Sequence, residues 1–208
     1  MLDGLSEFDS QDVRRFVAYF ALALVSATWK FQVPSIKATF SGGFAFVLIG
    51  IADFSLPETL AMGCASIVVQ TLWRSSCKRN MRKAFFNIAG VAFGVQLAYV
   101  PVHFARADGI QRSAFMLLLA ALIYFVSNTA LVAGMIALIE EAGFRPVWQR
   151  LAGYGLPYYV AGGLVSTVII IVNRMWGWQA GIFILPFLYL TYTCYRAYLR
   201  SRGALRQA

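Results

Sequence analysis

Long apolar segments separated by clusters of arginine and lysine are the feature that most restricts how this chain can fold. The densest cluster lies at residues 74–83, between two apolar segments, and its members are Arg74, Lys78, Arg79, Arg82 and Lys83. Apolar stretches of about 20 residues are long enough to cross the ~30 Å hydrocarbon core of a bilayer as helices. Charged residues make up 13% of the chain, against about 25% in soluble domains. The pattern therefore predicts an integral membrane protein.

The apolar segments predict an all-α fold, a polytopic membrane bundle of six or seven transmembrane helices. The expected helices cover residues 16–31, 43–52, 56–73, 84–104, 113–139, 151–172 and 181–198. Arg14 and Arg15 bound the first helix, and we expect a charged connection at 140–150 and a tight loop at 173–179. We expect a single membrane domain over residues 1–208, with a polar N-terminal tail (1–12) and a basic C-terminal tail (199–208). The start carries acidic residues and lacks a positively charged region, so we expect no cleaved signal peptide.

The number of spans depends on residues 41–73, which are too long for one span and too short for two full ones. A polar break divides this stretch. Ser55 and Glu58 have the spacing of a capping box, and Pro57 suits the first turn of a helix. One helix therefore ends just before the break and the next begins near Leu56.

The basic cluster at 74–83 predicts the orientation, because short cytoplasmic loops are enriched in lysine and arginine. With this cluster inside, the C-terminal tail is also inside, and the localisation is the bacterial inner (cytoplasmic) membrane, with multiple spans. If segment 43–52 crosses the membrane, there are seven spans and the N-terminus is outside. If that segment is re-entrant, there are six spans and the N-terminus is inside. The lysine and arginine count is the same in both arrangements.

Polar and aromatic side chains inside the apolar segments are the candidate ligand-binding residues. Polar groups are costly in a membrane, which makes them candidates for function. The amides can alternatively bond across helices, and tyrosines often form interfacial belts. A pocket between helices for a small apolar or flat ligand is the sharper hypothesis. The candidates are Asn87, Gln96, Asn128, Tyr158 and Tyr159.

Nothing in the sequence matches a catalytic or metal-binding motif, so we expect no enzyme and no metal site. Cys64, Cys77 and Cys194 are far apart and lack metal-ligand spacing. The cofactor is left open. The net charge of +9 comes from clusters between apolar segments, which fits anionic lipid headgroups as partners rather than nucleic acid.

Several stretches resemble the N-terminal membrane region of bacterial signalling proteins that carry a GGDEF diguanylate cyclase or HD-GYP phosphodiesterase domain. They are TFSGGFAFVLIGIADFSLPETL at 39–60, VQ at 69–70 with WR at 73–74, FNIA at 86–89, and YLTY at 189–192 with YR at 195–196. The resemblance covers about residues 13 to 200. The architecture is also similar, more weakly, to the substrate-binding subunits of energy-coupling-factor vitamin transporters.

The resemblance implies a non-catalytic membrane sensor or ligand-binding module that signals through its cytoplasmic C-terminal helix or a partner. No cyclase or phosphodiesterase residue is present, so no catalytic role carries over. We expect a protein partner or a missing cytoplasmic output domain. Homo-oligomerisation is left open. The alternatives are a vitamin-like substrate-binding transporter subunit and an accessory subunit of a larger membrane complex.

Overall fold

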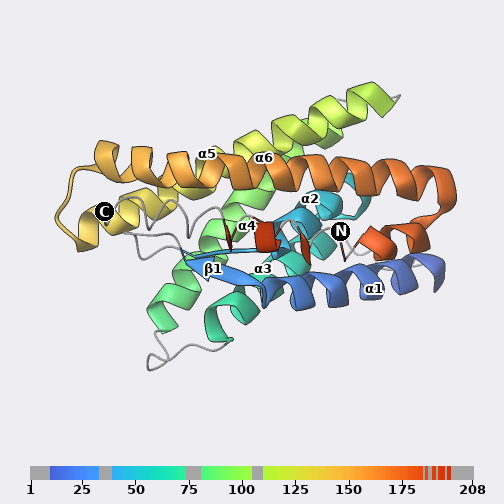
Figure 1. Cartoon of the computed structure of the whole chain (residues 1–208), viewed down its shortest axis with the longest axis horizontal. Coiled ribbons are helices and arrows are strands. Elements are labelled where there is room, and N and C mark those ends of the chain that lie inside the picture. The colour runs from blue at the N-terminus through green and yellow to red at the C-terminus, as the bar shows by residue number, and fades with distance from the viewer. Residues whose placement is uncertain are drawn as a thin grey trace.

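The protein is a bundle of α-helices with one short β-ribbon (Figure 1). The computed structural model describes residues 10–32, 39–73, 81–104, 110–184, 186, 189–190, 192–194 and 196–197. Within these ranges the elements are α1 (Ser10–Ala27), β1 (Lys30–Gln32), β2 (Thr39–Ser41), α2 (Gly43–Asp53), α3 (Leu56–Leu72), α4 (Met81–Phe104), α5 (Ile110–Ile139), α6 (Phe144–Trp176) and the 3-10 helix η2 (Trp178–Ile184). The prediction of an all-α helical bundle is confirmed. The predicted basic tail and residues 1–9 of the predicted polar tail lie outside the described residues, whereas residues 10–12 of that tail form the start of α1.

Helix α2 is the centre of the bundle. It contacts α1, α3, α4, α5 and α6, and every residue from 43 to 51 is buried. Its sequence explains this position, because a helix that is apolar on all sides must be covered on all sides. At 11 residues, α2 is only ~16 Å long, so the helix alone is about half as long as the hydrocarbon core of a bilayer.

The β-ribbon connects α1 to α2. Strands β1 and β2 are antiparallel, with Lys30 opposite Ser41. Gly42 allows the turn from β2 into α2 to pass close to α1, because a Cβ at this position would lie 3.1 Å from the Ser26 carbonyl oxygen. The ribbon was not expected from the apolar pattern, which placed residues 16–31 in one helix. The helix ends at Ala27 and the chain continues as a strand from Lys30.

The predicted break between α2 and α3 lies where the sequence placed it. Phe54 has extended backbone angles, which end α2 after Asp53. The Glu58 carboxylate accepts a hydrogen bond from the Ser55 backbone N–H (2.9 Å) and another from the Ser55 hydroxyl (2.6 Å). Together with Pro57 in the first turn, these contacts form the cap of α3.

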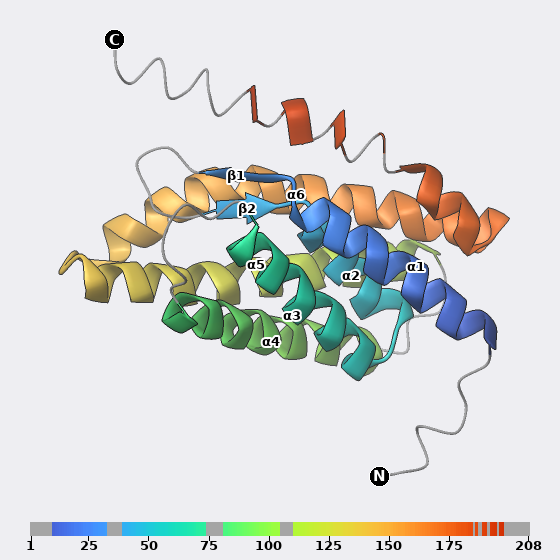
Figure 2. The same cartoon turned by 90° about the horizontal axis from the view of Figure 1, so that it is seen from below.

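The helices alternate in direction between two ends of the bundle (Figure 2). At the end that we call the ribbon end, the Ser41 hydroxyl donates to the side-chain oxygen of Gln70, near the end of α3 (2.7 Å). At the other end, which we call the Arg15 end, α2 stops and α3 begins. Tyr99, near the end of α4, donates there to the carbonyl oxygen of Phe54 (3.2 Å). Helix α2 is therefore antiparallel to α3: its start is directed toward the ribbon end and its last residue toward the Arg15 end.

Helix α1 begins at the Arg15 end, where Arg15 forms an ion pair with Asp53. Helix α3 finishes at the ribbon end, where the Lys30 ammonium group donates to the carbonyl oxygen of Trp73. The chain thus enters the bundle at one end and reaches the start of the basic cluster, at Trp73, at the other.

Helices α5 and α6 extend further than the sequence predicted. The prediction of a charged connection over residues 140–150 was wrong in part, because α6 already begins at Phe144. Pro146 does not oppose this early start, since proline is tolerated in the first turn of a helix. The loop predicted at 173–179 is also shorter: α6 continues to Trp176 and ends at Gly177, whose positive φ of 87° favours glycine.

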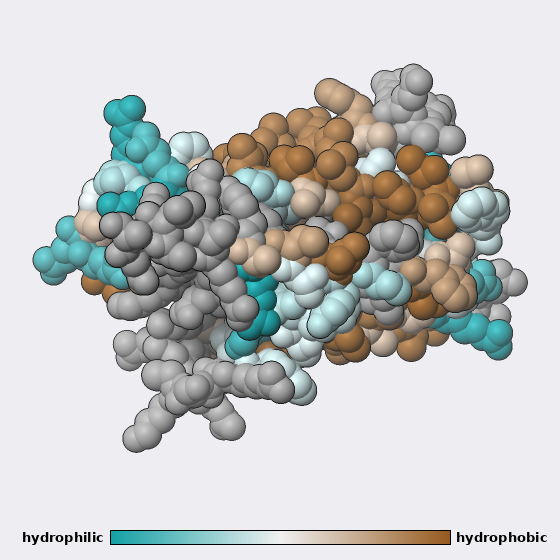
Figure 3. Space-filling model, in the orientation of Figure 1, coloured by the Kyte–Doolittle hydropathy of each residue, from teal (hydrophilic) through white to brown (hydrophobic). Residues whose placement is uncertain are grey.

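On the face shown in Figure 3, apolar side chains cover much of the described surface between polar groups at the two ends. Large exposed apolar side chains on α4, α5 and α6 include Phe93, Leu97, Leu118, Leu122, Val160, Leu164 and Val168. In the described part of the chain, three helices are long and apolar enough to cross a membrane, within 84–104, 114–139 and 144–176, and α2 and α3 are shorter apolar helices. The prediction of six or seven spans stays a prediction.

Candidate functional site

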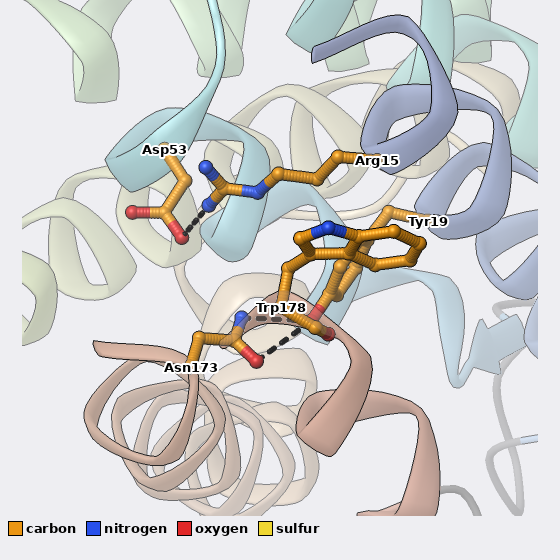
Figure 4. A network of polar contacts seen from close by, with 5 residues as sticks. All are labelled: Arg15, Tyr19, Asp53, Asn173 and Trp178. Atoms are coloured by element: carbon orange, nitrogen blue, oxygen red, sulfur yellow. Dashed lines mark hydrogen bonds and ion pairs between the residues drawn. The ribbon is translucent and has the colours of Figure 1, made fainter. Parts of the chain in front are cut away.

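Polar side chains from distant parts of the chain meet at the Arg15 end, and we call Arg15, Tyr19, Asp53, Asn173 and Trp178 the end network (Figure 4). Arg15 on α1 pairs with Asp53 at the end of α2, and both side chains are largely buried (24% and 13% exposed). The guanidinium also lies 5.1 Å from the centre of the Phe54 ring, within range of a cation–π interaction. These contacts fix the start of α1 to the break between α2 and α3.

The second half of the end network fixes α1 to the end of α6. Tyr19 is completely buried, and its hydroxyl accepts a hydrogen bond from Asn173 Nδ2 (2.7 Å). Its proton is donated either to Asn173 Oδ1 (3.0 Å) or to the carbonyl oxygen of Trp178 (3.1 Å). Trp178 is the first residue of η2. We call the described residues of 178–197 the C-terminal segment. The start of this segment is therefore hydrogen-bonded to α1.

The C-terminal segment also contacts the other end of α1. The Trp29 ring lies 5.2 Å from the Tyr189 ring in an edge-to-face arrangement and 6.3 Å from the Tyr192 ring. The Tyr192 hydroxyl donates a long hydrogen bond to the carbonyl oxygen of Lys30 (3.4 Å). The segment thus begins at the Arg15 end and returns to the ribbon end along α1.

Three of the five predicted ligand-binding residues gather at one place in the bundle. Asn128 Nδ2 on α5 donates to the Tyr159 hydroxyl on α6 (2.9 Å). The Tyr158 hydroxyl donates to the carbonyl oxygen of Ser41. The Phe44 ring, in the first turn of α2, lies 4.5 Å from Tyr159 and 5.9 Å from Tyr158. These side chains, with Tyr124 and Phe125, form a buried aromatic cluster around the start of α2.

The other two predicted residues lie elsewhere. Gln96 is exposed on the outer face of α4, and Asn87 is half-buried nearer the start of the same helix. The apolar pattern could not separate these positions, because α4 is apolar on most of its surface. The basic cluster that predicts the topology lies outside the described residues: residues 74–80 are not described, nor are the side chains of Arg82 and Lys83.

The sequence did not identify the end network. Arg15 was read as a boundary of the first span, and Tyr19 and Asn173 carried no local signal. Tyr19 and Asn173 are separated by 154 positions, and only the folded chain brings them together. A single polar residue near the end of an otherwise apolar helix was the available hint, and Asn173 was instead placed in a loop.

The described residues contain no group of three histidine, cysteine or acidic side chains that could hold a metal ion. Cys64 is half-buried on α3 and Cys194 is exposed, and both are free thiols. His103, also considered in the sequence, is exposed and stacks on the Tyr99 ring at 3.7 Å. The polar groups described above connect helices to one another.

Comparison with known proteins gives one match. The family model MASE9 matches residues 8–197, which is most of the chain. No curated protein and no solved structure matches the chain. MASE domains are membrane-associated sensor domains, which agrees with the apolar surface and the long apolar helices. The chain therefore belongs to the MASE9 family.

Proposed function

We propose that this protein is a non-catalytic membrane sensor in which a change at the buried helix α2 alters how the C-terminal segment packs on α1. The observation that carries the proposal is the position of α1. It contacts α2 through the Arg15–Asp53 ion pair and the C-terminal segment through Tyr19 and Trp29. Helix α6 also contacts both α2 and η2, so α1 is one of the two elements that α2 and the C-terminal segment share.

A signal that passes from α2 through α1 to the C-terminal segment needs an element with two packing arrangements, because a stimulus shifts an equilibrium only when it favours one state. The C-terminal segment is suited to this role. Its described contacts to α1 are a few hydrogen bonds and ring contacts, and its outward residues Tyr189 and Leu190 are more than half exposed. Segments with few buried contacts open at low free-energy cost. The output would be a fused cytoplasmic domain or a protein partner.

The proposed orientation follows from the two ends of the bundle. The basic cluster follows Trp73 at the ribbon end, and such clusters favour the cytoplasmic face. Helix α1 begins at the Arg15 end, so the N-terminus would face the periplasm of a bacterial inner membrane. In this arrangement the chain would pass between the two ends seven times, counting the ribbon with α2 as one passage. The C-terminal segment would deliver its signal on the cytoplasmic side.

Mobility of a spin label on Cys194 tests the coupling in the full chain. The label is attached in a background with Cys64→Ala and Cys77→Ala. Tyr19→Phe removes the hydroxyl that holds Asn173 and the Trp178 carbonyl, so we expect a more mobile label. The matched control is Tyr99→Phe, which removes a hydroxyl at the same end of the bundle whose hydrogen bond goes to Phe54 and not to a residue of the end network. Equal mobility in Tyr19→Phe and the parent would contradict the proposed route.

A further inference from the structure

The start of α2 is a helix N-terminus buried inside the bundle without a side-chain cap. The first N–H groups of any helix lack partners within the helix. Gly42 occupies the cap position, and as a glycine it supplies no side-chain cap hydrogen bond. Gly43, Phe44 and Ala45 are nevertheless buried. These N–H groups and the positive end of the helix dipole therefore face an interior without bulk water.

Ser66 is an independent sign of a missing ligand at the same place. This residue on α3 is 5% exposed, and its hydroxyl oxygen has no hydrogen-bond partner among the described residues. A Cβ placed on Gly43 would lie 3.6 Å from that oxygen, so the hydroxyl faces the first residue of α2. A buried hydroxyl without a partner destabilises the folded chain. An occupant that accepts a hydrogen bond would remove this cost.

The surroundings offer donors rather than acceptors. The carbonyl oxygen of Ser41 already accepts from Tyr158, and that of Ala45 accepts from Ser166 (2.9 Å). The Ser41 hydroxyl, which also lies 3.6 Å from a Cβ on Gly43, uses its proton on Gln70. A carbonyl oxygen can accept two hydrogen bonds, but a water molecule here would have to donate to oxygens that already take part in one. An anion needs only donors.

The charges agree with this assignment. Lys30 lies at the ribbon end, where its ammonium group bonds to carbonyl oxygens of α3 (3.3 Å to Gln70). Among the described acidic side chains, Asp53 and Glu58 lie at the Arg15 end. Glu140 and Glu141 are exposed in the turn between α5 and α6. No described carboxylate therefore contacts the start of α2.

We propose that the N-terminus of α2, with the Ser66 hydroxyl, binds a small monovalent anion. Ser66 Cβ would lie 3.3 Å from a Cβ on Gly43, so the space beside Gly43 admits only a small ion such as chloride or formate. One part of this inference, that the anion is the stimulus at α2, rests on the proposed sensor function. Anion binding itself is independent of any coupling to the C-terminal segment.

Thermal unfolding of the purified full chain tests the site. Sodium bromide and sodium formate are compared with sodium gluconate at equal ionic strength, because gluconate is too large for the site. We expect bromide or formate to raise the apparent Tm, and the two salts distinguish a halide from a carboxylate. Ser66→Ala should weaken the apparent affinity about tenfold or more, since one hydrogen bond to a charged group is lost.

Ser127→Ala is the matched control, because Ser127 is a helical serine whose hydroxyl already bonds to the Tyr124 carbonyl oxygen (3.1 Å). It should retain the full salt response. In crystals grown with bromide, we expect anomalous scattering within hydrogen-bond distance of Ser66 Oγ. A water molecule there without bromide, or equal salt responses in Ser66→Ala and Ser127→Ala, would overturn the site. If binding persists while the Cys194 label is unaffected by bromide, only the coupling fails.

Discussion

Gly181 packs directly against the Tyr19 hydroxyl, and a Cβ on this glycine would overlap both that hydroxyl and the Asn173 side chain. Gly181 lies in η2, so the absence of a side chain is what allows η2 to approach α1 and α6 this closely. The contact joins the first helix of the chain to the segment that follows the last long helix. It is the tightest constraint on where the C-terminal segment begins.

Substituting Gly181→Ala tests this approach. The added methyl group has no space, so η2 must move away from Tyr19, and overpacking of this kind costs about 1–3 kcal/mol. We expect a lower apparent Tm in thermal unfolding and a more mobile label on Cys194. The matched control is Gly153→Ala on α6, where a Cβ would meet nothing within 4 Å. That control should be neutral or slightly stabilising, because alanine favours a helix over glycine by about 0.5–1 kcal/mol.

The Arg15–Asp53 pair can be measured with a double-mutant cycle. Arg15→Met leaves the Asp53 carboxylate largely buried without its partner, and we expect a loss of about 1.5–3 kcal/mol in the free energy of unfolding. Asp53→Leu should cost a similar amount. The double variant should lose less than the sum, because an apolar pair replaces a buried ion pair at low cost. Strictly additive losses would show that the two charges do not interact.

The sequence predicted those features of the fold that are encoded locally. The break at Ser55 and Glu58 was found because a capping box involves residues three positions apart. The boundaries of α4 and α5 were predicted within a few residues, because each boundary lies where the sequence changes between polar and apolar composition. The ribbon was missed, since three-residue strands next to apolar helices carry almost no periodic signal.

The candidate site was predicted only in part, for a related reason. When a helix is apolar around most of its surface, its sequence does not show which face is buried. Gln96 and Asn128 therefore looked equivalent, although Gln96 is exposed and Asn128 bonds to Tyr159. The end network depends on contacts between α1 and α6. Such contacts follow from tertiary packing, which hydropathy does not encode.

The cap of α3 should contribute measurable stability. Glu58→Ala removes the acceptor for the Ser55 backbone N–H, and losing a cap interaction typically costs about 0.5–2 kcal/mol. We expect a lower apparent Tm and no change in the response to bromide, because the cap lies at the Arg15 end. Gln96→Ala, at an exposed helical position, is the control and should stay within about 0.5 kcal/mol of the parent. An unchanged Tm in Glu58→Ala would mean that the cap is dispensable.

The arrangement of the two ends predicts where the N-terminus lies. Ser10 starts α1 at the Arg15 end, whereas Cys77 belongs to the basic cluster that follows Trp73 at the ribbon end. We expect these two positions to face opposite sides of the membrane. The measurement uses a membrane-impermeant maleimide on spheroplasts, with Cys64→Ala and Cys194→Ala in the background. One variant keeps Cys77, and the other carries Ser10→Cys with Cys77→Ala.

The Ser10→Cys variant should be labelled in intact spheroplasts, and the variant that keeps Cys77 should be labelled only after lysis. This result requires the ribbon and α2 together to cross the membrane once. Helix α3 then crosses in the opposite direction and ends on the side of Cys77. Labelling of both cysteines from the same side would place the N-terminus beside the basic cluster. The six-span arrangement, with α2 re-entrant, would then hold, and α2 could not run antiparallel to α3 between opposite ends of the bundle.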